Sequence, residues 1–305
     1  MDELNRGTAG GWVKHPVNPL LGGEYGTCFD ISMLYEDGII TMYFSWREQK
    51  SIAMCQSKDG IHWSTPRFCI QPRATTSGWE DDLNRPSVVK RGGIYRMWYT
   101  GQHHAGQTDG TSHIFYAASK DGVIFERTDD NLVLSPELPW EKQAVMCPGV
   151  LWDEDKQLYK MWYSGGEQHE PNAIGYAESI DGIQWEKSRM NPIFHADPAS
   201  SWERHKVAGC QVMPYQNGYL MFYIGFRNED YAQIGAARSA DGITSWKRSK
   251  HNPIIAPDKN AWDGEACYKP FVLRVNGQWM LWYNGRNGQK EQIGLATHSG
   301  DELFL

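Results

Sequence analysis

The 305-residue chain lacks the features that mark several specialised classes of protein. It has no apolar run near the roughly 20 residues that a membrane helix needs, so we expect no membrane partner. It has no block of Lys or Arg, and 30 basic against 37 acidic residues give a net charge of −7, which argues against nucleic-acid binding. Its six cysteines include no Cys-x-x-Cys pair, and its polar N-terminal residues contain no signal-peptide core. We therefore expect reduced thiols and a cytoplasmic location.

Aromatic residues and glycine are abundant instead. Trp, Tyr and Phe make up 13% of the chain, and there are 31 glycines. Short apolar runs with alternating aromatic residues, separated by Gly-containing turns, are typical of many short strands. The composition therefore predicts an all-β protein.

A five-residue motif recurs along the chain at intervals of 60 to 64 residues. It reads Met-Trp-Tyr-Thr-Gly at 97–101 and Met-Trp-Tyr-Ser-Gly at 161–165, with related copies at 221–225 and 281–285 and a weaker one at 42–46. A Ser-x-Asp-Gly turn follows every copy except the one at 281–285, and Asp-Gly favours tight hairpins. Five such repeats of about four strands each predict a five-bladed β-propeller with four-stranded blades, forming one domain over residues 1–305.

A third marker shows how the propeller would close. Asn-Pro followed by an aliphatic residue occurs at 191–193 and 252–254, but the copy that the last repeat lacks stands near the N-terminus, at 18–20. The first strand of the chain is therefore expected to complete the last blade. A ring closed in this way has no free sheet edge.

Most of the repeated residues are expected to be structural. The Trp, Tyr, Met and Asp-Gly markers are interpreted as packing and turn residues rather than as a sugar-stacking series. A Trp followed by an acid also recurs once in each of four repeats, which indicates a structural role for these acids: Trp79-Glu80, Trp140-Glu141, Trp202-Glu203 and Trp262-Asp263.

Candidate binding residues follow from aligning the innermost strand of each repeat on the Met-Trp-Tyr marker. The alignment places one residue per blade at the start of the tunnel: Asp30, Arg85, Cys147, Gly209 and Lys269. Four positions earlier stand Gly26, Asp81, Gln143, His205 and Glu265. Variable polar loops at the same end add Arg47, His103, Glu167, Arg227 and Arg286.

Charged residues in such a tunnel must pair with one another or bind a ligand, because an unpaired buried charge is costly. The expected substrate-binding set is Arg85, Lys269, His205, Asp81, Arg47, His103, Glu167, Arg227 and Arg286. The alternative is that Asp30 pairs with Arg85 or Lys269 and merely closes the tunnel.

No metal or cofactor is expected. His103, His104 and His113 match no known metal-ligand spacing, and a loop that contacts sugar is the preferred interpretation. Cys147 is expected to be a small packing residue, since no base is positioned to activate it.

Together the repeats, Met-Trp-Tyr-[Ser/Thr]-Gly, Asn-Pro-[Ile/Leu] and Ile-Gly-Tyr-Ala-x-Ser-x-Asp-Gly-Ile at 174–183 resemble the five-bladed propeller glycosidases over the whole chain. These comprise glycoside hydrolase families 43, 32, 68, 117 and 130. The resemblance to families 43 and 32 implies three tunnel carboxylates, of which Asp30 matches the base or nucleophile. Arg85 stands where the second acid is expected, and Cys147 stands at the start of the third blade, which lacks the Glu general acid.

The resemblance implies a glycosidase that acts on a small oligosaccharide or glycoside, with Asp30 as base or nucleophile and Glu265 or Asp82 as general acid. The Arg/Lys set also resembles family 130, which implies a phosphorylase that binds inorganic phosphate, or a hydrolase of an acidic sugar. A third possibility is a propeller that binds carbohydrate without catalysis. The sequence leaves the oligomeric state open.

Overall fold

The computed structural model describes residues 7–73, 80–104, 109–128, 130–167 and 171–303. Trp79 and the polar residues 1–6, which entered the sequence interpretation, lie outside this part. The only helices in the described ranges are short 3-10 turns: η2 (Gly23–Tyr25), η3 (Arg47–Gln49) and η4 (Pro139–Glu141). No helix there is long and apolar enough to cross a membrane. The remaining regular structure is β-strand, which confirms the predicted all-β class.

The strands form consecutive antiparallel groups. The first group comprises β2 (Cys28–Glu36), β3 (Ile39–Trp46), β4 (Ser51–Ser57) and β5 (Arg67–Ile70). The second comprises β6 (Asp82–Arg91), β7 (Ile94–His103), β8 (Thr111–Ser119) and β9 (Leu132–Leu134). The third comprises β10 (Ala144–Asp153), β11 (Leu158–Gly166) and β12 (Pro171–Ser179), with the short β13 (Glu186–Lys187) and β14 (Phe194–His195).

The fourth group comprises β15 (Lys206–Tyr215), β16 (Gly218–Phe226), β17 (Ala232–Ser239) and β18 (Lys247–Arg248). The fifth comprises β19 (Ala266–Val275), β20 (Gln278–Asn287) and β21 (Lys290–His298), and it takes its outer strand from the N-terminus as β1 (Trp12–Lys14). One parallel bridge between Ala144 and Ser112 joins the second and third groups.

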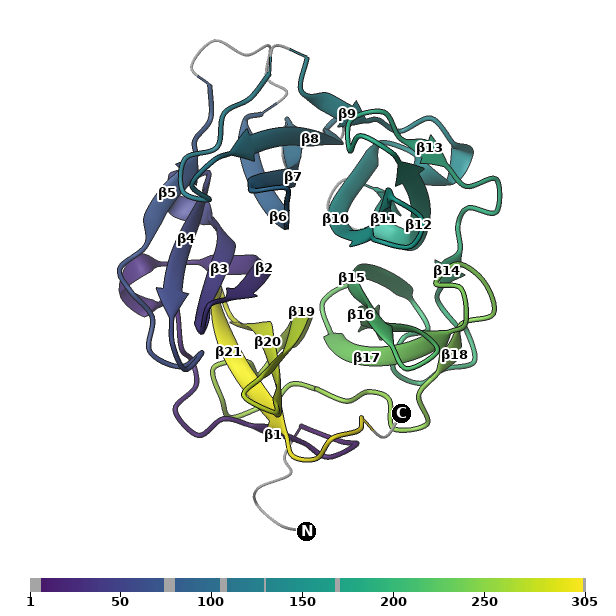
Figure 1. Cartoon of the computed structure of the whole chain (residues 1–305). Helices are drawn as coiled ribbons and strands as arrows, with labels where there is room; N and C mark the ends of the chain where they lie inside the picture. Colours follow the sequence, from purple (N-terminus) through teal and green to yellow (C-terminus); the bar gives the residue numbers. More distant parts are fainter. Residues whose placement is uncertain (1–6, 74–79, 105–108, 129, 168–170, 304–305) are drawn as a thin grey trace.

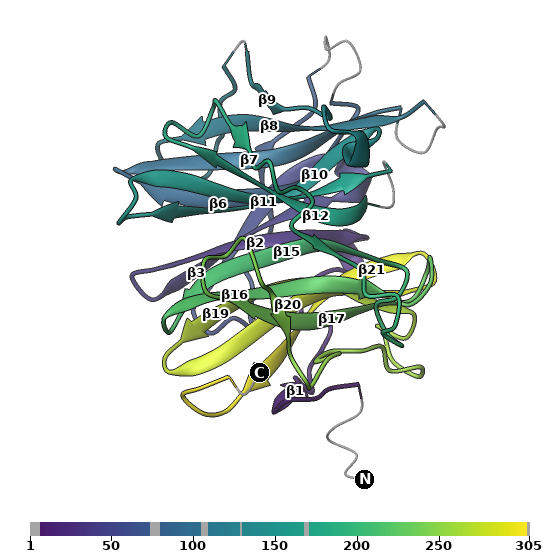
Figure 2. The same ribbon diagram turned by 90° about the vertical axis from the view of Figure 1, so that its right-hand side faces the viewer.

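The groups stand around a central axis with the first strand of each innermost (Figure 1). Along the chain these inner strands contact one another in the order β2, β6, β10, β15 and β19, and β19 contacts β2 in turn. From the side, the groups are stacked as layers (Figure 2), and the bridge at Ala144 joins the second group to the third. The chain thus has a β-propeller-type fold.

Strand β1 binds the last strand of the chain, as the displaced Asn-Pro marker predicts. Trp12 pairs with His298 and Lys14 with Ala296 in antiparallel register. Trp12 is buried, and Lys14 Nζ lies 2.6 Å from a carboxylate oxygen of the fully buried Asp263. The same ammonium donates to the carbonyl of Ala256 at 2.7 Å. Apolar burial and a buried ion pair therefore fasten β1 to the fifth group.

We expect Lys14→Ala to destabilise the protein by about 3 kcal/mol, because removing one partner of a buried ion pair leaves the other charge uncompensated. The exposed Lys58 offers a control, since Lys58→Ala removes a charge from the surface. Urea unfolding measures both variants. Equal stability of the two would show that the Lys14 contact does not hold β1.

The repeated tryptophans link one group to the next. Trp98 Nε1 donates to the carbonyl of Gly182 at 2.7 Å, and Trp162 Nε1 donates to that of Gly242 at 2.8 Å. In the same way Trp282 of the fifth group donates to Gly60 of the first group at 3.0 Å. Each acceptor is the glycine of an Asp-Gly turn. These bonds explain why the two markers recur together, and they confirm the structural interpretation of both.

The recurring acids are buried and paired. Glu141 accepts from the hydroxyl of Tyr163 at 2.6 Å and lies 2.7 Å from Lys187 Nζ. The same arrangement of a motif tyrosine, a buried acid and a cation recurs as Tyr99, Glu80 and Arg127, and as Tyr283, Asp263 and Lys14. In the fourth group Glu203 pairs with Arg248. Each acid thus pairs within its own strand group, which confirms a structural role for these acids.

Candidate active site

The five residues that the sequence alignment placed at the start of the tunnel share one backbone conformation. Each has a positive φ and lies at a register break of an inner strand. The φ values are 51° for Asp30, 56° for Arg85, 53° for Cys147, 22° for Gly209 and 48° for Lys269. A bulge of this kind re-aims a side chain. The alignment of these five positions is therefore confirmed by the backbone.

Side chains of the preceding group hold most of these bulges in place. The backbone N–H of Arg85 donates to Ser45 Oγ at 2.8 Å, and that of Asp30 donates to Asn284 Oδ1 at 3.1 Å. Equivalent bonds join Cys147 to Thr100 and Gly209 to Ser164. Every acceptor occupies the fourth position of the Met-Trp-Tyr motif. The repeat therefore fixes the geometry of the ring as well as its packing.

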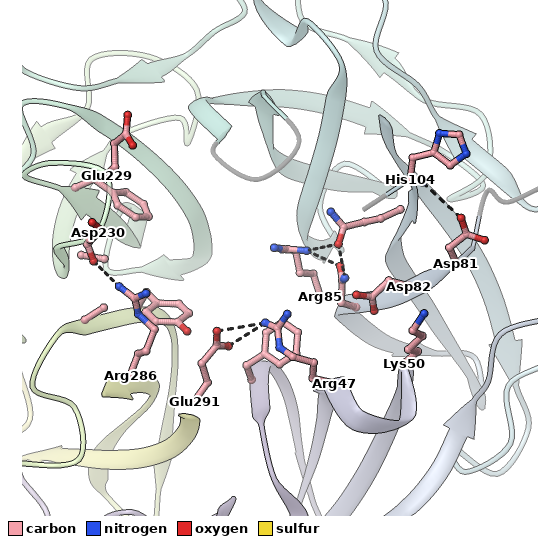
Figure 3. A pocket seen from close by; sticks show the side chains of 17 residues that line it. Arg47, Lys50, Asp81, Asp82, Arg85, His104, Glu229, Asp230, Arg286 and Glu291 are labelled. Atoms are coloured by element: carbon pink, nitrogen blue, oxygen red, sulfur yellow. Dashed lines mark hydrogen bonds and ion pairs between the residues drawn. The ribbon is translucent and has the colours of Figure 1, made fainter. Parts of the chain in front are cut away.

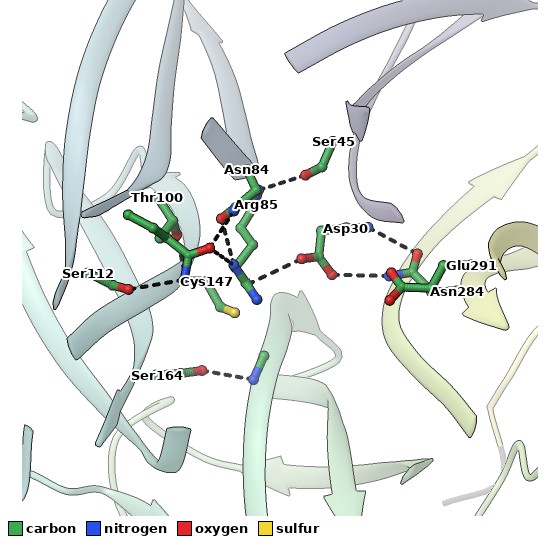
Figure 4. A network of polar contacts seen from close by, with 12 residues as sticks. Asp30, Ser45, Asn84, Arg85, Thr100, Ser112, Cys147, Ser164, Asn284 and Glu291 are labelled. Carbon is green, nitrogen blue, oxygen red and sulfur yellow. Dashed lines mark hydrogen bonds and ion pairs between the residues drawn. The ribbon is translucent and has the colours of Figure 1, made fainter. Parts of the chain in front are cut away.

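Asp30 and Arg85 form a largely buried ion pair in this ring (Figure 4). Arg85 Nε lies 3.2 Å from Asp30 Oδ2, and their side chains are 17% and 6% exposed. Asn284 donates to the other carboxylate oxygen of Asp30 at 3.0 Å, and Arg85 donates to Asn84 Oδ1 at 2.6 Å. Burial would lower the pKa of Arg85, but Cys147, Asp30 and other nearby acids raise it above its usual value. The guanidinium is thus held charged and oriented.

A cavity of about 760 Å³ opens above this pair. Its size suits a small organic ligand. The residues that line it come from inner strands and from the loops at one end of the groups: Phe29, Arg47, Lys50, Asp81, Asp82, Asn84, Arg85, Gln102, His104, Phe226, Glu229, Asp230, Ala232, Ala266, Tyr268, Arg286 and Glu291. The lining is strongly charged (Figure 3). A polar ligand with many hydroxyl groups fits such a surface better than an apolar one.

Asp82 lines this cavity, and its carboxyl has a raised pKa. Burial raises it above the usual value, and the nearby cations of Arg85, Arg47 and Lys50 oppose the rise. Asp82 begins β6, so the strand that carries Arg85 also fixes its position. Asp82 and Asp81 lie on one side of the cavity, and Glu229 and Asp230 lie on the other (Figure 3). Acids therefore face each other across the space where a ligand would bind.

The side of the cavity between these acids is built by the first and fifth groups. Arg47 Nη2 lies 3.2 Å from Glu291 Oε1, and its guanidinium stacks on the ring of Phe29 with a distance of 4.4 Å to the centroid. Tyr268 bonds to the Glu291 carboxylate, and burial raises the pKa of this tyrosine well above its usual value. Arg286 donates to the backbone carbonyl of Asp230 at 2.8 Å. On this side Arg47 and Glu291 form an ion pair, and Arg286 is held by a backbone carbonyl.

A histidine pair borders the cavity beside Asp81. The rings of His103 and His104 stack with centroids 3.8 Å apart, and His103 Nδ1 lies 3.5 Å from Asp81 Oδ2. His104 Nδ1 lies 2.9 Å from Asp109 Oδ2. Among the described residues no group of three or more His, Cys, Asp or Glu side chains is arranged to hold a metal ion.

The structure brings together only some of the candidate residues from the sequence. Asp81, Asp82, Arg85, Arg47 and Arg286 line the cavity, and His103 adjoins Asp81. Asp30 and Lys269 are buried in the ring behind it. The remaining candidates are exposed and do not belong to the described lining: Glu265, His205, Glu167 and Arg227. Glu167 pairs with Lys142 at 2.8 Å, and Arg227 stacks on Tyr231 at 4.1 Å.

Several lining residues were not predicted. Glu229 and Asp230 belong to the polar loop that supplied Arg227, and Lys50 and His104 adjoin Arg47 and His103. For these residues the polar loops gave a usable signal, although the residue named from one loop, Arg227, lies outside the described lining. Glu291 follows a turn at the start of β21, and no repeat marker points to it.

Comparison with known protein families identifies the family of this chain. The model of glycosyl hydrolases family 43 matches residues 17–299. The chain belongs to this family. A Mycobacterium tuberculosis protein, MT1551, is similar to this family 43 chain, with 28% identity over 86% of this chain and 89% of that protein. The β-1,2-mannobiose phosphorylase of a Thermoanaerobacter species is 25% identical over 52% of this chain and 53% of the enzyme.

Among solved structures, a glycosyl hydrolase from Bacteroides ovatus superposes on this family 43 chain with a TM-score of 0.76. The match covers 99% of this chain and 98% of that one, at 14% sequence identity. This likeness supports the β-propeller-type fold. The ring of this family 43 chain carries Arg85 and Cys147 at positions where the resemblance led us to expect acids.

Proposed function

We propose that the chain is one domain over residues 1–305, a five-bladed propeller in which each strand group is one blade. The cyclic contacts of the inner strands support this proposal, as do the pairing of β1 with β21 and the bond from Trp282 to Gly60. We also propose a cytoplasmic location. All six cysteines lie in the described ranges, buried and free of disulfides, which suits a reducing compartment.

We propose that the protein cleaves a glycosidic bond of a small oligosaccharide or glycoside in this cavity, with Asp82 as the general acid. The observation that carries the proposal is the raised pKa of Asp82 in a cavity whose opposite side holds carboxylates. A carboxylic acid that stays protonated can donate to the leaving oxygen, while a carboxylate on the other side activates water. Asp230 and Glu229 are the candidates for that base.

In this proposal Asp30 acts through Arg85. Its carboxylate oxygens bind Arg85 Nε and Asn284 Nδ2, and its side chain is 6% exposed. It therefore orients the guanidinium that faces the cavity beside Asp82. Glu265, the other acid considered from the sequence, is exposed outside the described lining, so we assign the acid role to Asp82.

A second candidate is phosphorolysis of the same bond. The observation that favours it is the set of cations Arg85, Arg47 and Lys50 that act on the Asp82 carboxyl. One acid beside several cations suits a reaction in which phosphate replaces water, because guanidinium groups bind phosphate well. The likeness to a β-1,2-mannobiose phosphorylase supports the same choice.

The test is product analysis with β-1,2-mannobiose and a panel of small neutral disaccharides, each with and without inorganic phosphate. Hydrolysis is expected to release two free sugars at a rate independent of phosphate. Phosphorolysis is expected to need phosphate and to form a sugar 1-phosphate. Saturable binding of a sugar with no product under either condition would contradict both candidates and leave a carbohydrate-binding propeller.

A further inference from the structure

The side of the cavity between the fourth and fifth groups carries an apolar patch. Phe226, Ala232, Ala266 and Tyr268 line the cavity and belong to one cluster of packed side chains. We call these four residues the apolar wall. Their side chains contain one hydrogen-bonding group, the Tyr268 hydroxyl, and that group bonds to the carboxylate of Glu291. The rest of the side-chain surface of the wall is hydrocarbon.

Paired strands build this wall. Phe226 ends β16 and Ala232 begins β17, and the two residues are partners in antiparallel register. Ala266 begins β19, where its partner on β20 is Arg286. Both β16 and β17 contact β19. The wall therefore spans the seam between two strand groups, and its two alanines are fixed by sheet pairing.

The two alanines limit what the wall can hold. Ala232 is 1% exposed and Ala266 is 2% exposed, although both line the cavity. Behind them Ala208 and Ile224, which are also buried, fill the interior of the same cluster. Such small exposed areas in front of a filled interior suit contact with a small apolar group and not with a hydrocarbon chain.

The remainder of the cavity supplies the opposite chemistry. Charged side chains such as Asp81, Asp230 and Arg286 line it and suit the hydroxyl groups of a sugar. A hydroxymethyl group that lies against the wall has no side-chain partner for its hydroxyl, and an unpaired polar group is costly. A methyl group at the same place has no such cost and loses apolar surface to water. The cavity can therefore distinguish one edge of a sugar from the others.

We propose that the apolar wall binds a methyl group carried by the sugar, so that the preferred substrate contains a deoxy sugar or an acetamido sugar. This deepens the proposed function and rests on it, because it names the substrate class of the same cavity. The shared chemistry is one methyl group at the edge of a polar ring. Its two sources are the C6 methyl of a 6-deoxyhexose and the acetyl methyl of an N-acetylhexosamine.

The experiment measures calorimetric binding of sugars in matched pairs. D-rhamnose with D-mannose, L-rhamnose with L-mannose, D-fucose with D-galactose and L-fucose with L-galactose test the C6 methyl. N-acetylglucosamine with glucose, N-acetylgalactosamine with galactose and N-acetylmannosamine with mannose test the acetyl methyl. We expect the methyl-bearing sugar of at least one pair to have a Kd lower by roughly tenfold to a hundredfold, the range over which an apolar pocket discriminates against a hydroxyl.

The pair that responds identifies the source of the methyl group. A difference within the first set indicates a 6-deoxyhexose, and a difference within the second set indicates an acetamido sugar. Equal binding within every pair, or no binding of any sugar in the panel, would overturn the proposal.

Ala266→Ser tests the wall with a side chain of nearly the same size. Its hydroxyl can bond to a hydroxymethyl group, so the ratio of the two Kd values within the responding pair should fall by about tenfold. Ala232→Ser makes the same change on the other strand if Ala266→Ser fails to fold. Ala237→Ser is the matched control, because Ala237 is a buried alanine of β17 outside the described lining. The control should lower the Tm and leave the ratio unchanged, and a folded wall variant with an unchanged ratio would contradict the proposal.

Asp82→Asn separates this proposal from the proposed function. It should keep the preference for the methyl-bearing sugar in binding while it loses turnover of glycosides that contain this sugar. Methyl preference in a wild-type protein that cleaves no glycoside would refute the proposed cleavage and leave the role of the wall standing. Cleavage of both glycosides of every pair with equal kcat/KM would refute the role of the wall and leave the cleavage standing.

Discussion

Asp82→Asn is expected to lower kcat/KM for glycosidic-bond cleavage by about a thousandfold, within the range that general-acid catalysis contributes. Asparagine keeps the shape of the side chain but has no proton to give to the leaving oxygen. The loss should be largest for natural disaccharides and much smaller for dinitrophenyl glycosides, whose leaving group needs no protonation. Initial rates on both kinds of substrate measure the difference.

The neighbouring acid provides the control. Asp81 also lines the cavity, but its side chain is 45% exposed and it faces the histidine pair. Asp81→Asn should affect KM more than kcat. If the two variants lost kcat equally on both kinds of substrate, the assignment of Asp82 as the acid would be wrong.

Ionisation of Asp82 is expected to make both the stability and the rate depend on pH. Burial raises the folded-state pKa of Asp82 above its ordinary value, so the protonated form is the one that folding favours. Its contribution to stability is therefore present below the ordinary pKa of an aspartic acid and is lost as the pH rises through the raised value. At neutral pH Asp82→Asn should be as stable as the wild type or more stable. The wild-type rate should fall on the alkaline side as Asp82 loses its proton.

Asp30→Asn is expected to reduce both stability and turnover. The Asp30–Arg85 pair is largely buried, and removing the acid leaves the guanidinium uncompensated, at a cost of about 3 kcal/mol. Arg85 then loses its orientation beside Asp82, and a displacement of about 1 Å near the reacting groups can lower the rate by about a hundredfold. Urea unfolding and kcat measure the two effects. The double variant Asp30→Asn with Arg85→Met should recover most of the stability and none of the turnover.

An ion pair remote from the cavity provides a control that separates the loss of stability from the loss of turnover. Lys160 Nζ lies 2.7 Å from Asp153 at the other end of the inner strand β10. Asp153→Asn should cost stability and leave kcat unchanged at temperatures where the protein stays folded. Recovery of Asp30→Asn turnover by added formate or azide, without recovery of stability, would show instead that Asp30 is itself the base or nucleophile.

Many of the strands could be predicted from local sequence patterns. In the second group the motif copy at 97–101 lies inside β7, as a recurring strand motif predicts. The outer strand of this group, β9, is short and spans Leu132–Leu134. Outer strands are harder to predict from sequence, because they pair along one edge only and contain fewer buried residues.

The residues of the candidate site could be predicted only in part. The alignment placed Asp30, Arg85 and Lys269 on one ring because the bulge occurs at the same position of each repeat, relative to the Met-Trp-Tyr motif. It also nominated His205 and Glu265, which the structure leaves exposed, because the approach to each inner strand is not repeated as faithfully as the strand itself. Loop residues such as Glu229 and Glu291 have no counterpart in the other repeats from which a position could be inferred.

The sequence by itself determined the strand repeat, the Asp-Gly turns, the displaced strand at the N-terminus and the charged ring positions, because each leaves a pattern of short period or fixed spacing. Only the tertiary structure decided which charges meet. Asp30 pairs with Arg85, Lys269 lies over Gly209 without a carboxylate partner in the described chain, and burial raises the pKa of Asp82. The physical reason is that burial and charge pairing depend on the packing of strand groups about 60 residues apart in the chain, which no local pattern records.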